Sequence, residues 1–352
     1  MDFELSDDEA ALADGIRSLC AGRFPLDRLR AAEGGDGLVD LEGWSELAEA
    51  GVFSLQLPEA SGGIGLGMAA SAVVFEELGR ALIPGPLLAS HLAAYLLAGP
   101  TDGPTDGPTD GRVEGVPDGL VDGVAEGKVV VGAVRRPPTS GTGAFVPALV
   151  ESWSSLGVLV VVDDEGMAVV DPAELDAVRI ARPLDPLTAL WRVDRLPEGR
   201  RIAGAAAAHR WRRDQAVLGG ALLVGLAAGT LEMAVAYAKQ REQFGKPIGS
   251  FQSVKHMCAD MLVAAETARA AVHAAAVTID QPGVGDADRA AAGAGLLASE
   301  AAIKNGRTCI QVHGGMGFTW DVPAHLYLMR ARVLSEAIGP VAGLAELVAE
   351  LF

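Results

Sequence analysis

The sequence after Gly204 is dominated by long helical patterns, and this feature restricts the possible folds more than any other. Apolar residues recur at helical spacing over about 206–243, 251–279, 286–312 and 324–338, with a shorter pattern running to 351. Helices of this length with an apolar face bury it by packing side by side. We therefore expect a C-terminal helical bundle over residues 205–352.

Two other kinds of pattern precede the expected bundle. Residues 1–100 contain shorter helical patterns, the first of them over 5–20 with Ser6 as its N-cap. Residues 128–204 instead contain short β-branched runs separated by glycine, proline and aspartate, over 129–134, 156–162, 167–170 and 177–180. The sequence therefore predicts a mainly α fold with an N-terminal helical domain, a small middle β domain and the bundle.

Residues 101–127 have a low-complexity composition. An acidic residue followed by glycine recurs at every fourth position, and Gly-Pro-Thr-Asp is repeated at the start. Glycine and proline at this density break helices, and like charges aligned on one face would repel. Calcium-binding loops vary their ligand types and end in a closing glutamate. We interpret this segment as a solvated acidic linker rather than a metal site.

Charge and cysteine content exclude several classes of function. Lys plus Arg total 28 against 46 for Asp plus Glu, a net charge of -18, which disfavours nucleic acid as a partner. The three cysteines are widely spaced and suggest neither a disulfide framework nor a metal site. The acidic N-terminus does not resemble a signal peptide, so we expect a cytoplasmic protein. The uncharged stretch at 216–231 is short for a membrane span and is interpreted as a buried helix.

The strongest local signal is Tyr-Ala-Lys-Gln-Arg-Glu-Gln-Phe-Gly-Lys-Pro-Ile at 237–248. It predicts a helix that ends at a glycine, a turn that contains proline, and a second helix running back. This arrangement presents Arg241, Gln243 and Gln252 at one end of a helical hairpin, where a guanidinium can hold a diphosphate through paired, charge-assisted bonds. Taken alone, an arginine at a helix end is more often a capping or surface residue.

A second signal is the glycine cluster Gln-Val-His-Gly-Gly-Met-Gly-Phe at 311–318. Three glycines in four positions after a long helix allow the backbone to approach a ligand closely and expose N–H donors. Termination of the helix would explain one of the three.

Together these two segments resemble the acyl-CoA dehydrogenase family. The likeness extends to Trp44, Pro58-Glu59, Gly62-Gly63 and the run 76–79, Glu-Glu-Leu-Gly. The resemblance implies an N-terminal helical domain, a middle β domain and a C-terminal four-helix bundle, which agrees with the periodicity. It also implies flavin-dependent α,β-dehydrogenation of an acyl-CoA thioester.

The resemblance further implies which residues hold the cofactor FAD. The positions that match the family contact the adenosine diphosphate half of an FAD held mainly by the neighbouring subunit; they are Arg241, Gln243, Phe244, Gln252, Gln311, Gly314 and Gly315. The family's segments around the flavin ring, Thr-Glu-Pro with Gly-Ser-Asp and Trp-Ile-Thr-Asn, are absent between 128 and 204. One half of the flavin site is thus present in the sequence and the other half is not.

The catalytic base is also missing from its usual positions. The reaction needs a carboxylate to take the α-proton, and most family members supply it from a Glu-Gly-Thr segment that 334–340 lacks. Gln215 stands at the alternative position, and an amide is not a base. Asp214 is the candidate base, with a partnership to Arg210 or Arg213 as the other interpretation. The remaining candidates are interpreted as structural or solvated: Glu336, Asp321 as an N-cap, His313 and His325.

The leading hypothesis is a base-deficient subunit of a heteromeric acyl-CoA dehydrogenase that completes a shared FAD site. The segments 317–320 and 325–328 resemble partner subunits of such enzymes, which act on CoA thioesters of bulky substrates such as steroid side chains. One alternative is a self-sufficient homo-oligomeric enzyme that uses Asp214. Another is a non-catalytic scaffold without flavin. The sequence leaves open whether CoA or a carrier protein bears the acyl group. Electron-transfer flavoprotein is the expected electron acceptor, and no membrane partner is expected.

Overall fold

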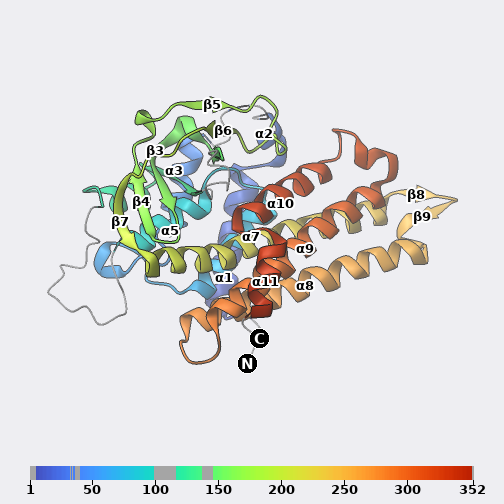
Figure 1. The fold of residues 1–352 in the computed structure, drawn as a ribbon. Helices are drawn as coiled ribbons and strands as arrows, with labels where there is room; N and C mark the ends of the chain where they lie inside the picture. The colour runs from blue at the N-terminus through green and yellow to red at the C-terminus, as the bar shows by residue number, and fades with distance from the viewer. Residues whose placement is uncertain are drawn as a thin grey trace. The chain divides into compact units, whose positions relative to one another are not determined.

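The computed structural model describes residues 5–31, 33, 35, 40–98, 116–136 and 146–350, drawn as a coloured ribbon in Figure 1. The chain forms two compact units: unit 1 contains 1–26, 68–83 and 215–352, and unit 2 contains 27–67 and 84–214. Helix α7 (Ala205–Gln240) begins in unit 2 and continues in unit 1. Because these units follow contacts in space, they match the boundaries expected from the sequence only in part.

Unit 1 is mainly helical, and two of its helices begin at a side chain that caps the first turn. Its helices, besides the larger part of α7, are α1 (Asp7–Arg23), α4 (Met68–Arg80), α8 (Gln252–Asp280), α9 (Ala287–His313), α10 (Ala324–Ile338) and α11 (Val341–Glu350). The expected cap of α1 is confirmed: Ser6 accepts a bond from the Glu9 N–H, and the Glu9 carboxylate accepts one from the Ser6 N–H. The side chain of Asp286 caps α9 by accepting hydrogen bonds from the N–H groups of Asp288 and Arg289.

Helix α7 is the core of the bundle, whereas α8 leaves much of its apolar surface exposed. Both are long and apolar enough to span a membrane by length and composition. The most apolar stretch of α7 is 83% buried inside the fold, but that of α8 is only 28% buried. On α8, Leu262 and Val263 are 48% and 65% exposed. The burial of α7 fits its interpretation as a bundle helix.

Close backbone contact joins α4 to α7. A Cβ added at Gly79 would lie 2.1 Å from the Leu222 carbonyl oxygen, and one added at Gly225 would lie 2.0 Å from the Glu76 carbonyl oxygen. Real Cβ atoms do not approach backbone oxygen this closely, so the crossing needs glycine on both helices. Asn305, fully buried on α9, donates from Nδ2 to the carbonyl oxygens of Ala227 on α7 and Met261 on α8 and so links three helices.

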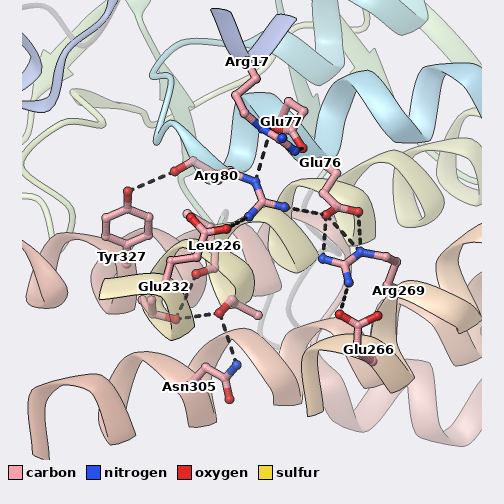
Figure 2. A network of polar contacts seen from close by, with 12 residues as sticks. Arg17, Glu76, Glu77, Arg80, Leu226, Glu232, Glu266, Arg269, Asn305 and Tyr327 are labelled. Carbon is pink, nitrogen blue, oxygen red and sulfur yellow. Dashed lines mark hydrogen bonds and ion pairs between the residues drawn. The ribbon is translucent and has the colours of Figure 1, made fainter. Parts of the chain in front are cut away.

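A network of charged side chains lies where α1, α4, α7 and α8 meet (Figure 2). Glu76 accepts bonds from Arg269 at 2.8–3.0 Å and from Arg80 at 3.0 Å. Glu77 accepts two bonds from Arg17 at 2.8 and 2.9 Å. Arg80 also pairs with Glu232. Glu76 and Glu77 are only 7% and 4% exposed, so these carboxylates rely on their cationic partners in place of water.

Unit 2 combines short helices with two small sheets. Its helices are α3 (Leu41–Glu49), α5 (Leu87–Leu97), α6 (Leu120–Ala125) and most of α2 (Leu26–Ala31). Its strands are β1 (Val130–Arg135), β2 (Ala148–Glu151), β3 (Leu156–Val162), β4 (Gly166–Val170), β5 (Ala177–Arg179), β6 (Leu190–Val193) and β7 (Arg200–Gly204).

The sheets place apolar strands next to one another. The four-stranded sheet has the order β1-β3-β4-β7, with β1 and β3 parallel and the other pairs antiparallel. The three-stranded sheet has the order β2-β6-β5 and is antiparallel. Buried residues of both sheets form one core cluster; they are Ala148, Val150, Leu159, Val161, Val170 and Val193. Alternate residues of the strands therefore meet in one core, as expected for packed sheets.

Within unit 2, the structure differs from the sequence-based expectations in its strands and in the expected linker. Strands β2, β6 and β7 have no counterpart in the predicted runs, because arginine, glutamate and glycine interrupt their apolar pattern. The second half of the expected linker contains helix α6, in which Leu120 and Val124 are buried. These apolar side chains pack inside unit 2, so this part is not a solvated linker. The rest of the expected linker, 101–115, lies outside the described residues.

Candidate functional site

The helical hairpin expected at 237–248 is present at one end of unit 1 (Figure 1). The Arg241 N–H donates to the Tyr237 carbonyl at 2.8 Å, and the Arg241 carbonyl accepts the Ile248 N–H at 2.7 Å. Between these bonds, strand β8 (Glu242–Gln243) pairs antiparallel with β9 (Lys246–Pro247). The connection between α7 and α8 is thus a tight, hydrogen-bonded β-hairpin, which projects beyond the helices.

The tip of the hairpin is strained and exposed. Phe244 and Gly245 have φ angles of 54° and 75°, the combination that a two-residue type I′ turn requires. A positive φ at a bulky aromatic residue costs roughly 1–3 kcal/mol. The Phe244 side chain is 92% exposed, with its ring edge-on to Phe251 at 6.1 Å between centroids. Burial within this chain does not account for the strain, so Phe244 is a candidate for contact with a ligand or another subunit.

The polar side chains of the hairpin are available to a ligand. Arg241, Gln243 and Gln252 are all exposed. Gln243 donates to the neighbouring Glu242 carbonyl at 2.8 Å, and the Gln252 amide lies 3.5 Å from the His256 ring nitrogen. Within the described residues, the Arg241 guanidinium has no carboxylate partner. These are the donor groups that the sequence predicts for a diphosphate.

The glycine cluster follows directly on the end of α9. Gln311 is exposed in the last turn, and His313 is buried with its Nδ1 at 2.8 Å from the Cys309 carbonyl oxygen. Gly314 has a φ of 62°, and neither Gly314 nor Gly315 has a neighbour within 4 Å of an added Cβ. The described chain therefore leaves open space over these two glycines, which fits the close approach of a ligand.

A stacked ring pair brings the two segments together. The Tyr237 ring, one turn before Arg241, stacks on the His313 ring with 4.2 Å between centroids. Buried residues from both segments belong to one core cluster: Ala234, Ala238, Met261, Cys309, Val312, Val322 and Ala324. The hairpin and the glycine cluster, which are far apart in the sequence, thus form one end of the bundle. The interpretation of His313 as a structural residue fits this position.

The candidate base Asp214 is held by an arginine. Asp214 lies on α7 and is fully buried, with one carboxylate oxygen 2.9 Å from both Nε and Nη2 of Arg213. The expected partnership with Arg213 is therefore present, although Asp214 itself is buried and Arg213 is partly exposed.

The two positions at which the family can carry its base are adjacent in space. Gln215 donates from its side-chain amide to the Ala337 carbonyl at 3.0 Å, within the segment 334–340 that lacks Glu-Gly-Thr. Neither position carries a carboxylate: Gln215 is committed to a structural hydrogen bond, and Ile338, the residue before Gly339, is apolar and buried. Glu336 is exposed.

Two smaller expectations concern the segment before α10. The N-cap role expected for Asp321 is wrong, because the N-cap position of α10 is Pro323 and no side chain caps it. His325 places Nδ1 at 2.8 Å from the Val322 carbonyl oxygen and packs edge-on against Trp320. These contacts give His325 a local structural role, as its interpretation from the sequence suggested.

Family models match both helical regions of the chain. The N-terminal domain of acyl-CoA dehydrogenase matches residues 6–100, and the C-terminal domain of acyl-CoA dehydrogenase matches residues 214–351. Among full-length relatives, acyl-CoA dehydrogenase IpdE2 of Mycolicibacterium smegmatis is 31% identical over 344 residues, covering 96% of each chain. The chain therefore belongs to the acyl-CoA dehydrogenase family, whose cofactor is FAD.

Other similar proteins differ in length and assembly. Acyl-CoA dehydrogenase FadE34 of Mycobacterium tuberculosis is 34% identical over 302 residues, which cover 83% of this chain but only 39% of FadE34. A solved structure, the Tcur3481-Tcur3483 steroid ACAD G363A variant, is 25% identical with a TM-score of 0.80 and covers 98% of this chain and 97% of that one. The ChsE4-ChsE5 complex from Mycobacterium tuberculosis matches at 24% identity and a TM-score of 0.81, covering 99% and 98%, and supports the fold.

Proposed function

We propose that this chain is a subunit of a flavin-dependent acyl-CoA dehydrogenase of mixed subunit composition, in which it completes an FAD site shared with a related chain. The proposal depends on a combination of two features. The hairpin end exposes hydrogen-bond donors, and neither position at which the family carries its base has a carboxylate. The first feature is suited to holding a cofactor. The second means that the proton acceptor for the α-carbon comes from another chain.

The residues present fit the diphosphate of FAD. The Arg241 guanidinium offers two parallel N–H donors to phosphate oxygens, and Gln243, Gln252 and Gln311 offer neutral donors around it. The open space over Gly314 and Gly315 allows a nucleotide to lie against the backbone. FAD, when bound, accepts the hydride that leaves the β-carbon of the substrate. This chain orients the cofactor from its adenosine end.

The substrate class follows from the family and its similar proteins. The reaction removes a proton from the α-carbon and a hydride from the β-carbon of an acyl thioester, giving the α,β-unsaturated thioester and reduced flavin. One similar structure is described as a steroid ACAD, and another is a complex of two different chains. We therefore propose a CoA thioester of a bulky, steroid-like acid as substrate, with electron-transfer flavoprotein as acceptor.

The proposal is tested by flavin content. The chain is purified alone and after co-expression with a family member that has the flavin-ring segments and a base, and the FAD absorbance per chain is measured. A colourless lone chain and a yellow mixed complex with one FAD per pair are expected. A lone chain that binds one FAD per subunit and is bleached by an acyl-CoA would contradict the proposal and would point to Asp214 as base. If neither preparation holds flavin, a scaffold role is favoured.

The variant Arg241→Ala tests whether this chain contributes to FAD binding. Loss of a charge-assisted bidentate contact is expected to weaken FAD binding by the mixed complex about tenfold or more. Arg332→Ala is the control, because Arg332 is an exposed arginine on α10 that belongs to neither segment of the site. Equal FAD affinity in the two variants would contradict the assignment of Arg241.

A further inference from the structure

The lysines of unit 1 lie on the hairpin and on the helices α7, α8 and α9. The chain has a net charge of -18 and only five lysines, four of which lie between 239 and 304: Lys239, Lys246, Lys255 and Lys304. Lys246 caps the face of the Phe251 ring at 4.5 Å, within the hairpin. In an acidic protein, cations gathered at one place favour the binding of an anion.

Part of this charge faces a cavity between α8 and α9. The cavity has a volume of about 310 Å³ and is lined by Met257, Asp260, Lys304, Arg307, Thr308 and Gln311. The four residues from α9 follow the spacing i, i+3, i+4 and i+7, so they lie on one face of the helix. Gln311 belongs both to this cavity and to the candidate FAD site.

The two cations in the cavity are not neutralised within the described residues. Lys304 and Arg307 form no ion pair there, in contrast to Arg17, Arg80 and Arg269, each of which has a carboxylate partner. Asp260 is the single carboxylate of the lining, so the cavity keeps a net positive charge. Two cations one turn apart repel each other, and a bound anion would relieve this repulsion.

We propose that Lys304 and Arg307 form a second phosphate subsite, continuous through Gln311 with the diphosphate site at Arg241. The proposal rests on the proposed function, because it takes the ligand to be an adenine nucleotide. Seven residues of helix separate Lys304 from Gln311, about 10 Å along the axis, which is within the reach of one nucleotide. The guanidinium of Arg307 holds a phosphate monoester or diester through two parallel N–H bonds, with Lys304 as a point charge beside it.

Two phosphate esters of the reaction match this chemistry. One is the phosphate next to adenosine in the same FAD diphosphate that Arg241 would hold, and the other is the phosphate on the ribose of CoA. The flavin-stripped mixed complex is titrated with FAD, and separately with CoA, in the parent protein, Lys304→Ala, Arg307→Ala and Arg307→Lys. Arg332→Ala is again the control for the loss of one exposed arginine, and circular dichroism of each variant checks that the helices remain folded.

Arg307→Ala and Lys304→Ala are each expected to weaken one of the two ligands about tenfold, and Arg307→Lys is expected to restore part of the loss. If FAD binds more weakly and the affinity for CoA is unchanged, the subsite belongs to FAD. If CoA binds more weakly and the affinity for FAD is unchanged, the subsite belongs to CoA. The proposal is overturned if both affinities match those of Arg332→Ala. It is also overturned if the subunits dissociate while the nucleotide affinities hold, because the cations would then pair with acidic side chains of the other subunit.

The two proposals fail in different ways. If Arg241→Ala weakens FAD binding and Arg307→Ala changes neither ligand, the shared flavin site stands and only the second subsite is lost. If Arg241→Ala has no effect on FAD, the proposed function itself fails, whatever the behaviour of Arg307.

Discussion

Glu76 is a buried charged residue away from the candidate site that links two helices. Its carboxylate is almost fully buried on α4 and is held by Arg269 on α8 and by Arg80 one turn along its own helix (Figure 2). Burial alone would raise the pKa of Glu76, but hydrogen bonds from His273 and Arg269 and the charges of Arg269 and Arg80 outweigh it and lower the pKa to about 2. The ion pair between Glu76 and Arg269 therefore joins α4 to α8.

Replacing Glu76 by glutamine is expected to destabilise the protein by about 3 kcal/mol, because the substitution leaves the Arg269 charge partly buried without its main partner. Glu266→Gln is the control, since Glu266 pairs with the same arginine but its side chain is 55% exposed; a cost below about 1 kcal/mol is expected. Urea unfolding followed by circular dichroism measures both. Equal costs for the two variants would show that burial of Glu76 has no energetic consequence.

From the lowered pKa of Glu76 we expect this residue to contribute to unfolding in acid. The pKa of Glu76 is about 2 in the folded protein and ordinarily 4.5, so the stability it supplies is present above about pH 4.5 and is lost as the pH falls toward 2. The difference in unfolding free energy between the parent protein and Glu76→Gln should therefore shrink over this range. A difference that stays constant between pH 5 and pH 2.5 would contradict the lowered pKa.

At the scale of elements, the crossing of α4 and α7 explains part of the Glu-Glu-Leu-Gly run at 76–79. The two glutamates form ion pairs with arginine side chains, Leu78 is fully buried, and Gly79 allows the backbone of α7 to approach. Gly225 plays the reciprocal part on α7. A run that the sequence offers only as a family signature thus has a physical reason at each of its positions.

Gly225→Ala is expected to destabilise the protein by about 3 kcal/mol or more, since the added methyl group would overlap the Glu76 carbonyl oxygen and push the helices apart. Gly293→Ala on α9 is the matched control, because nothing lies within 4 Å of an added Cβ there. That substitution should stabilise by up to about 1 kcal/mol through helix propensity. Thermal unfolding distinguishes the two, and a similar small effect at both glycines would disprove the close crossing.

At the scale of the whole molecule, the chain has features of an incomplete assembly. Helix α8 exposes Leu262 and Val263, and the hairpin tip exposes Phe244. Beside the tip, the Arg241 guanidinium has no carboxylate partner among the residues that the structure describes. Exposed apolar surface of this kind marks interaction sites. A second, related subunit would cover the apolar surface and supply the missing part of the flavin site, which is the arrangement proposed above.

Val263→Glu is expected to weaken subunit association while leaving the folded subunit intact, because the side chain is 65% exposed and glutamate is a good helix former. Light scattering coupled to size-exclusion chromatography measures the assembly. Leu347→Glu is the control, since it places the same charge on a 40% exposed leucine of α11. Unchanged assembly in Val263→Glu, or equal dissociation in both variants, would argue against α8 as the contacting surface.

Much of the fold could be predicted from the sequence because helices and strands are set by local periodicity and by caps within one turn. The helix 324–338 and the strand 156–162 have the expected bounds, and Ser6 caps α1 as expected. Strand β6 was missed, since its exposed Arg192 breaks the apolar run and only pairing with β2 and β5 defines it. The role proposed for Lys304 and Arg307 was also not predicted, although their helical spacing with Gln311 is visible in the sequence.

The sequence by itself determined the order of helical and strand segments, the two motifs of the candidate flavin site and the lack of a glutamate at the usual base positions. Each of these depends on residue identity over a short stretch of chain. Only the tertiary structure decided that Tyr237 stacks on His313 and so joins the two motifs, that Asp214 is buried against Arg213, and that Gln215 bonds to Ala337. The physical reason is that burial and pairing depend on neighbours supplied by distant segments, which local patterns do not specify.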